Sequence, residues 1–229
     1  MIRLDQRFNA FPSILSAELD ENIIAIDGDL DPQRLLLAYS LGIFPWYNED
    51  ETPILWQSPN PRFVLFPDQL NINRSLRRAL NRQTYQVSFN HCFKKVLENC
   101  ASTPRAGQDG TWLNPNLINS LCELHHNGFA VSAEAWLNDE LVGGLYGVTL
   151  GGVFFGESMF SHQADASKVA FVTLVQALVD AGYQVIDCQD YTPHLERFGA
   201  IRISRESFYQ LLREYIKIKP RALVQPNPR

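Results

Sequence analysis

No apolar run in this sequence approaches the roughly 18 consecutive residues that a membrane-spanning helix requires. Residues 1–13 carry charges throughout and contain no apolar core of the kind that marks a secretion signal. The four cysteines form no C-x-x-C pair, so we expect reduced thiols and no disulfide framework. Together these absences predict a cytoplasmic protein that has no membrane partner.

An excess of positive charge is also lacking, because Lys and Arg number 20 against 25 Asp and Glu, a formal net charge of −5. This balance excludes a protein that coats nucleic acid non-specifically, although it allows a local basic patch. The five histidines form no metal constellation, since His125 and His126 are adjacent and on a helix would not face one site. We expect neither a metal ion nor a cofactor, and a monomer is the default.

Proline and glycine divide the chain into two parts. Asp31 is suited to cap a helix that has Pro32 in its first turn and ends at Gly42. Two closely spaced X-Pro steps in residues 56–62 then preclude a helix and favour extended chain. The predicted units are a small N-terminal domain over residues 1–61 and a larger domain over residues 62–229.

Apolar periodicity predicts the elements of the larger domain. Three apolar runs separated by Asn-Asp and Gly-Gly predict an antiparallel meander. A long helix that Asp165 would cap, ending near Gly182, follows the meander. The expected strands are 63–66, 85–89, 130–137, 141–150, 153–160 and 183–188, and the other expected helices are 75–82, 91–101, 115–126 and 206–216, before an irregular tail over 219–229.

The order of these elements indicates an α+β fold. Three antiparallel strands, a long helix and another strand suggest a core like that of the acetyltransferases, a GNAT-like domain. We therefore expect a small N-terminal domain followed by an acetyltransferase-like C-terminal domain. This comparison rests on the order of elements, and a fold alone does not name a function.

Asp187 and Gln189 stand at the end of the last expected strand. Because side chains alternate along a strand, these two share one face and Cys188 points the other way. A carboxylate and an amide placed together could hold and deprotonate an amine, or they could simply cap the next turn. Cys188 should face the core and has no clear histidine partner, which argues against a nucleophilic thiol.

Glu157 is a second candidate, because it lies in a strongly apolar strand. Alternation places it on one face with Phe155 and Met159. Burying an unpaired carboxylate is costly, so Glu157 should have a partner. That partner could be a structural cation or the ammonium group of a substrate.

Aromatic and basic residues could bind a nucleotide or an RNA end, because rings stack on bases and arginines pair with phosphates. Arg74, Arg78 and Arg82 are four residues apart and so share one face of their predicted helix. The alternative is a core aromatic cluster beside a solvated helix face. The residues concerned are Tyr39, Trp46, Trp56, Arg62, Arg74, Arg77, Arg78, Arg82 and Trp112.

Longer motifs from about residue 11 to about residue 215 resemble the leucyl/phenylalanyl-tRNA–protein transferase family. They are Gly28-Asp29-Leu30, Leu35-Leu36, Ala38-Tyr39, Gly42-Ile43-Phe44-Pro45-Trp46, Trp56, Ser58-Pro59, Pro61-Arg62, Gly110-Thr111-Trp112, Leu141-Val142-Gly143-Gly144-Leu145-Tyr146-Gly147, Gly156-Glu157-Ser158-Met159-Phe160-Ser161, Ala166-Ser167-Lys168, Ile186-Asp187-Cys188-Gln189, His194-Leu195 and Gly199-Ala200.

The resemblance implies an N-terminal domain joined to an acetyltransferase-like domain. It implies that Leu, Phe or Met moves from its aminoacyl-tRNA to an acceptor protein that begins with Arg or Lys. The product is then a degradation signal in the bacterial N-degron pathway.

The resemblance also assigns roles to residues. Asp187 and Gln189 match the family's catalytic pair, and Glu157 matches its active-site glutamate. Trp46 and Trp112 match tryptophans at the aminoacyl-adenosine end of the tRNA, where we also place Tyr39. The apolar side-chain pocket corresponds to Leu145, Phe154, Met159 and Leu174. The helix that carries Arg74, Arg77, Arg78 and Arg82 corresponds to the region that meets the tRNA acceptor stem.

The sequence departs from the family's common pattern at a few positions, which bear on how the tRNA end binds. Other residues are common in the family where this chain has Ile26, Gln57, Asn60, Leu121 and Val131. The set Asp187, Gln189 and Glu157 is unaffected.

The expected chemistry is aminolysis of an ester that is already activated. We expect Asp187 to orient the attacking amine and accept its proton, and Gln189 to steady Asp187 or donate to the oxyanion. Glu157 would hold the ammonium group of the donor amino acid.

Two other functions remain open from the residues. An acetyl-CoA-dependent acetyltransferase would usually bind pyrophosphate with a Gly-rich turn at a helix N-terminus, and residues 161–165 contain no glycine. A non-catalytic RNA- or peptide-binding module would keep its function after Asp187→Ala.

Overall fold

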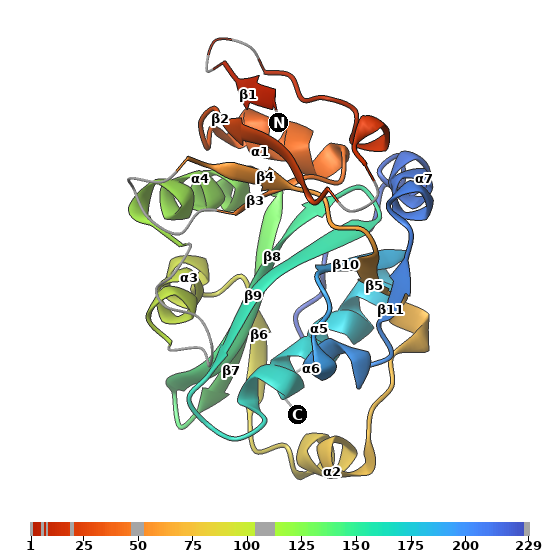
Figure 1. The fold of residues 1–229 in the computed structure, drawn as a ribbon. Helices are drawn as coiled ribbons and strands as arrows, with labels where there is room; N and C mark the ends of the chain where they lie inside the picture. The colour runs from red at the N-terminus through yellow and green to blue at the C-terminus, as the bar shows by residue number, and fades with distance from the viewer. Residues whose placement is uncertain are drawn as a thin grey trace.

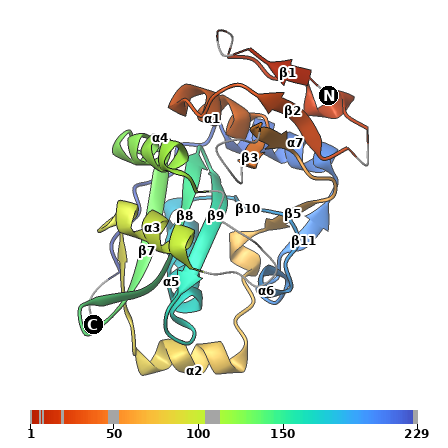
Figure 2. The ribbon, with the colours of Figure 1, turned by 60° about the vertical axis from the view of Figure 1, so that its left-hand side comes forward.

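The computed structural model describes residues 2–5, 7, 9–18, 21–46, 53–103 and 113–226, which form two β-sheets with helices packed around them (Figure 1). The smaller sheet lies at one end of the molecule, and helix α2 lies at the other end in both ribbon views (Figures 1 and 2). Within the described residues, no helix is long and apolar enough to cross a membrane.

The smaller sheet has the strand order β1-β2-β4-β3 and is built from the N-terminal residues. The predicted helix after Asp31 is confirmed as α1, because the Asp31 side chain accepts a hydrogen bond from the Gln33 N–H and Pro32 opens the first turn. The elements are β1 Ile2–Leu4, the 3₁₀ turn Ile14–Ser16, β2 Ile23–Asp27, α1 Pro32–Ser40, β3 Phe44–Trp46 and β4 Leu55–Gln57.

The larger sheet has seven strands in the order β11-β5-β10-β9-β8-β7-β6. The predicted meander is confirmed, and its first turn uses Asn138 and Asp139 at φ 51° and 64°. Every neighbouring pair is antiparallel except β9 and β10. The strands are β5 Arg62–Leu65, β6 Gln86–Phe89, β7 Ala130–Leu137, β8 Glu140–Leu150, β9 Val153–Ser161, β10 Val185–Gln189 and β11 Ile201–Ile203.

Two apolar clusters cover the two faces of this sheet. Alternation along β8 and β9 sends Leu145 and Phe154 into the cluster beneath α5, and Tyr146 and Phe155 into the cluster shared with α3 and α4. The helices are α2 Arg74–Arg82, α3 Phe93–Ser102, α4 Pro115–His126, α5 Ala166–Ala181, α6 Pro193–Glu196 and α7 Arg205–Tyr215, with a 3₁₀ turn at Pro67–Gln69.

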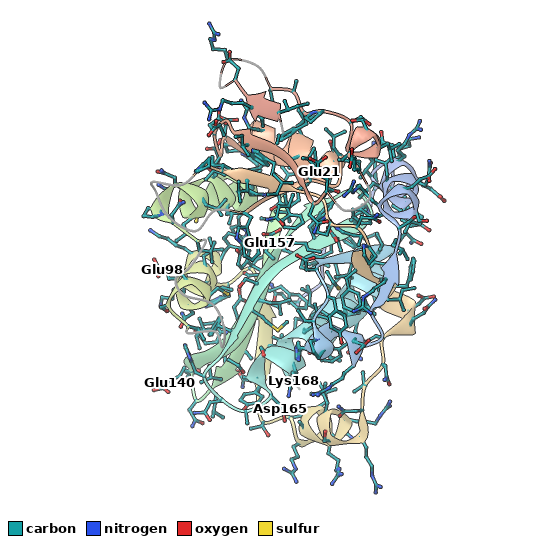
Figure 3. All side chains as sticks on the ribbon, viewed as in Figure 1. Glu21, Glu98, Glu140, Glu157, Asp165 and Lys168 are labelled. Carbon is teal, nitrogen blue, oxygen red and sulfur yellow. The ribbon has the colours of Figure 1, made fainter. Side chains whose placement is uncertain are left out.

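The crossover from β9 through α5 to β10 makes these two strands the one parallel pair of the larger sheet as described, and β1 and β2 are parallel in the smaller sheet. The start of α5 packs closely on β8, where a Cβ on Gly143 would lie 2.7 Å from the Ala166 Cβ. Asp165 was expected to cap α5, but it makes no side-chain cap hydrogen bond. Its carboxylate instead accepts from Lys168 Nζ at 2.6 Å, and Figure 3 labels both residues near the start of this helix.

Arg205, at the start of α7, ties the N-terminal elements to the larger sheet. Its guanidinium is only 5% exposed and donates to the backbone carbonyls of Ser58, Ile14 and Glu21. Buried arginine must be satisfied in this way, because an unpaired charge in the core is costly. The two sheets are therefore held together by polar contacts as well as by apolar packing.

The C-terminal tail lies along the edge strand β6. As expected it forms no helix or strand up to residue 226, but it is not free. Gln225 Oε1 accepts from the Phe89 N–H at 2.9 Å, and Gln225 Nε2 donates to the Phe89 carbonyl at 2.6 Å. One side chain thus satisfies both backbone groups of a residue on an otherwise open edge.

Candidate active site

A cavity of about 490 Å³ opens where strands β9 and β10 part. Their parallel ladder runs from the Val185–Val153 pair to the Asp187–Phe155 pair, and β9 then continues to Ser161 paired with β8 but no longer with β10. Residues from β8, β9, β10, α5 and α6 line the cavity, and Trp46 joins them from the smaller sheet. Its size is typical of a small-molecule site.

A buried ion pair lies beside the cavity. Arg62 Nε and Nη2 donate to Asp187 Oδ1 and Oδ2 at 2.8 and 2.6 Å, and the two side chains are 1% and 0% exposed. The rings of Phe44 and Phe208 lie 4.8 and 4.6 Å from the guanidinium carbon, one from each part of the molecule. Arg62 was grouped with residues that could bind a phosphate, and its burial in this pair contradicts that expectation.

Asp187 also fixes the backbone of the residue that follows the strand. The Gln189 N–H donates to Asp187 Oδ1 at 2.9 Å, while Gln189 itself has a φ of 62°. Such a conformation is costly for a residue other than glycine, so the surrounding contacts must hold it. Both oxygens of Asp187 are therefore engaged before any substrate arrives.

Glu157 receives two hydrogen bonds on one of its oxygens. The Tyr39 hydroxyl and Gln189 Nε2 both donate to Glu157 Oε1, at 2.9 and 2.8 Å. The other oxygen, Oε2, has no hydrogen-bond partner in the described part of the chain. Figure 3 shows Glu157 near the middle of the molecule, between the N-terminal elements and the larger sheet.

Burial raises the pKa of Glu157 to about 7. The hydrogen bonds from Tyr39 and Gln189 and the charge of Arg62 oppose this rise, while the charge of Asp187 adds to it. A carboxyl group whose pKa is close to neutral can gain and lose a proton under cellular conditions.

The floor of the cavity is apolar, and three of the four predicted pocket residues contribute to it. Leu145, Phe154 and Met159 line it. Leu174 was also expected there, but it is fully buried in the core and does not line the cavity. Phe171, one helical turn earlier on α5, occupies the wall instead, since residues three apart lie on one side of a helix.

The aromatic residues that were expected to bind the tRNA end have three different environments. Trp46 lines the cavity and is half-buried. Tyr39 is 1% exposed and reaches the cavity only through its bond to Glu157. Trp56 is fully buried and donates to the Asp27 carbonyl at 2.7 Å, so it is a core residue. Trp112 lies outside the described residues.

The four arginines of α2 are all exposed, and none forms an ion pair with an acidic residue of the described chain. Both ribbon views place α2 at the end of the molecule opposite the smaller sheet (Figures 1 and 2), and Figure 3 labels Glu157 away from that end. The helix therefore offers positive charge at a distance from the cavity.

Sequence reasoning missed several residues of the cavity wall, among them Asp190, Tyr191 and His194. They follow β10 and start α6, and the resemblance had marked only His194 as part of a motif. Cys188 also touches the cavity but is buried in the core, and burial raises its pKa, which disfavours a thiolate. The departures at Ile26, Gln57, Asn60, Leu121 and Val131 all lie away from the cavity lining.

This arrangement suits direct transfer of an acyl group to an amine. It combines an apolar pocket, a carboxylate with a pKa near 7 and an amide, without a reactive thiol in the cavity wall. The site and the α+β architecture thus define an acyltransferase that would draw its acyl group from an activated donor.

Comparison with known proteins identifies the family. The model of the leucyl/phenylalanyl-tRNA protein transferase family matches residues 64–213, and that of its N-terminal domain matches residues 28–60. A leucyl/phenylalanyl-tRNA–protein transferase of Syntrophobacter fumaroxidans is 52% identical over 90% of this chain and 87% of its own. One from Flavobacterium johnsoniae is 50% identical over 89% of this chain and 95% of its own. The chain belongs to the leucyl/phenylalanyl-tRNA–protein transferase family, and so it is an enzyme, an aminoacyltransferase that acts from aminoacyl-tRNA to protein N-termini.

Among solved structures, one titled the structure of L-PGS from Bacillus licheniformis has a TM-score of 0.40 and 13% identity over 83% of this chain and 65% of that one. This similarity is too low to assign the fold.

Proposed function

We propose that this enzyme transfers Leu, Phe or Met from aminoacyl-tRNA to proteins that begin with Arg or Lys, and so marks them for degradation. The observation that carries the proposal is Glu157, a carboxylate with a pKa of about 7 at the mouth of an apolar cavity. The cavity would receive the side chain of the donor amino acid, and the carboxylate would accept a proton from the attacking amine.

Glu157 is the proton acceptor in this proposal. The α-amino group of a protein has a pKa of about 7.7–8.0, so a base with a pKa of about 7 is matched to it. The free Oε2 of Glu157 can accept a hydrogen bond from the amine while Oε1 stays fixed by Tyr39 and Gln189. The amine nitrogen forms a bond to the ester carbonyl carbon and its proton passes to Glu157. The bond from that carbon to the tRNA ribose oxygen then breaks, and the oxygen takes the proton from Glu157 and leaves as a hydroxyl group.

We assign Asp187 a role that differs from the expected one. Both of its oxygens are held by Arg62 and one also accepts from the Gln189 N–H, so it is poorly placed to take a proton from a substrate. We assign Asp187 and Arg62 as positioning residues that hold Gln189 at the cavity. The second N–H of the Gln189 amide is then available to the developing oxyanion, a contact worth about 10²–10³ in rate.

The apolar floor accounts for the donor side chains. Leu145, Phe154, Met159 and Phe171 present carbon and sulfur atoms to the cavity, so a charged donor side chain would lose its hydration without compensation. An apolar pocket separates side chains of similar size by only about 1–3 kcal/mol per methylene. Acceptance of Leu, Phe and Met together follows from this weak discrimination.

The α2 arginines would bind the acceptor stem of the tRNA while Trp46 stacks at its aminoacyl-adenosine end. Replacing Arg74, Arg78 and Arg82 together by Ala should raise the KM for aminoacyl-tRNA and reduce its dependence on salt, because fewer phosphates are neutralised. Arg213→Ala, an exposed arginine on α7, is the matched control. Equal effects of the two changes would exclude α2 from the tRNA surface.

Several broader features belong to the same proposal. The domain division at residues 1–61 and 62–229 is supported by the two sheets, which draw on residues 2–57 and 62–203. An acetyltransferase-like class for the second domain is supported by the crossover β9–α5–β10 and the parting of its strands. We place the enzyme in the cytoplasm, because its charged-tRNA donor is a cytoplasmic molecule. We take a monomer as the default state.

The decisive experiment is a transfer assay with purified protein. Radiolabelled Phe-tRNA and, separately, Arg-tRNA are offered with peptides that begin with Arg or Ala. Label should pass only from Phe-tRNA and only to the Arg peptide. Transfer from Arg-tRNA would contradict the assignment of the apolar pocket, and equal transfer to the Ala peptide would contradict the proposed acceptors.

A further inference from the structure

The cavity wall contains a carboxylate that the transfer mechanism does not use. Asp190 follows Gln189 directly and lines the same cavity as Glu157. In a regular strand, neighbouring residues point to opposite faces. Here the register shifts between Asp187 and Gln189, and Gln189 has a φ of 62°, so consecutive residues from Asp187 to Thr192 all contribute to one wall.

Asp190 differs from the other two acidic residues of the cavity. Asp187 is paired with Arg62, and Glu157 is hydrogen-bonded by Tyr39 and Gln189. The Asp190 side chain has no hydrogen-bond or ion-pair partner in the described chain, and the residue is exposed at the cavity wall. Partial burial raises its pKa, the charge of Arg62 opposes the rise, and the charge of Asp187 adds to it.

The charge of the cavity favours a cation. Of the three carboxylates in its described lining, Asp187 is paired with Arg62, which leaves Glu157 and Asp190, and the described lining itself contains no lysine or arginine. His194 also lines it, but burial and the charges of Lys168 and Arg197 lower the pKa of this histidine, which keeps the ring neutral near pH 7. A free carboxylate in such a wall is complementary to a substrate cation.

We propose that Asp190 binds the side-chain cation of the acceptor's N-terminal Arg or Lys. The inference rests on the proposed function, in which the acceptor amine sits at Glu157 beside Gln189. Asp190 is the residue next to Gln189, which donates to Glu157, and all three line one cavity, so the amine site and this carboxylate belong to the same wall. The side chain of the acceptor is then selected at a subsite of the cavity wall, whereas the side chain of the donor binds at the apolar floor.

The test compares two peptides that differ only in one charge. One begins with Lys and the other with norleucine, which lacks the ammonium group, and both are offered with Phe-tRNA. We expect Asp190→Asn to raise the KM for the Lys peptide about tenfold, as for a partly desolvated ion pair, and to leave the norleucine peptide and the KM for Phe-tRNA unchanged. The preference for Lys over norleucine in the wild type should also shrink as salt is raised.

Glu196→Gln is the matched control. Glu196 lies on α6, accepts from the Tyr191 hydroxyl at 2.9 Å and is outside the cavity lining, so it changes the same charge a few residues away. A rise in KM with both peptides, a rise in KM for Phe-tRNA, or no change would overturn the subsite. If the wild type transfers to no peptide, the proposed function fails as well. If the wild type transfers the amino acid to the Lys peptide and the Asp190→Asn variant has the same KM, the proposed function stands and only the Asp190 subsite is refuted.

Discussion

Two of the three carboxylates at this cavity, Asp187 and Glu157, are chemically different because their surroundings differ. Asp187 on β10 is fully buried, and both of its oxygens accept hydrogen bonds from Arg62. Glu157 on the neighbouring strand β9 has neutral donors on one oxygen, no ion pair with a cation of the described residues, and a pKa raised to about 7 by burial. Two parallel neighbouring strands thus present one carboxylate held in an ion pair and one that can exchange a proton.

The difference teaches how roles can be assigned when two acidic residues share a site. A carboxylate that is held by arginine is stabilised as an anion and is a weak base, whereas a desolvated one has its basicity raised. Sequence alone favoured Asp187 as the proton acceptor, because it stands at a strand end beside Gln189. The contacts favour Glu157 for that role and make Asp187 a structural anchor. The following changes test this contrast.

The largest effect should come from Asp187→Ala. Loss of one partner leaves the Arg62 charge buried and unpaired, which should lower the free energy of unfolding by about 3–5 kcal/mol and abolish transfer. Urea denaturation measures the first effect. The double variant Arg62→Met, Asp187→Leu should recover most of the stability but no activity. A cost below about 1 kcal/mol for the single change would show that the pair is not the anchor.

The next effect is on rate. Glu157→Gln keeps the size of the side chain and its ability to accept from Tyr39, but it removes the base. We expect kcat to fall about 10²–10⁴-fold with a folded protein, and the rising limb of the pH–rate profile near pH 7 to disappear. Single-turnover transfer from Phe-tRNA measures both. Retention of that limb in the variant would assign it to another group.

Glu157 should also make the free energy of unfolding depend on pH. Its folded pKa of about 7 exceeds the ordinary value of 4.5, so between these values the folded state binds more protons than the unfolded state. The free energy of unfolding should therefore fall as pH rises from 4.5 to 7, by up to about 3 kcal/mol from this group. Thermal unfolding of the wild type and of Glu157→Gln across this range isolates the contribution, because the variant should lack that slope.

The smallest effect is expected for Tyr39→Phe. The Tyr39 hydroxyl lowers the pKa of Glu157 by donating to Oε1, so its removal should raise that pKa further. The pH–rate midpoint should move upward by less than about 1 unit, with a modest loss of rate at pH 7. A downward shift would mean that the hydroxyl stabilises the protonated acid instead.

Much of the fold could be predicted because its signals are local. The Asp31-Pro32 start of α1 and the Asn138-Asp139 turn depend on the dihedral preferences of neighbouring residues, and both are present. The meander of β7, β8 and β9 follows from alternation and turn residues alone. The expected strand 183–188 is displaced, since β10 runs over Val185–Gln189.

The errors concern contacts between distant residues. Arg62 and Asp187 are 125 positions apart, and no periodicity in the sequence reports such a pair. Leu174 and Phe171 are both apolar and share a helix, so which one reaches the cavity depends on how α5 is rotated on the sheet. Asp190 was missed because the bulge that turns it inward has no clear sequence signal.

The bond between Gln225 and Phe89 has a consequence for the behaviour of the protein in solution. A free strand edge is a template on which a second chain can add, and β6 has such an edge. The amide of Gln225 has one donor and one acceptor at the spacing of a backbone, and it occupies the Phe89 groups that an intruding strand would need. The Gln225 side chain thus blocks this point of the edge, and we expect a variant that ends before Gln225 to self-associate more readily although its cavity is intact.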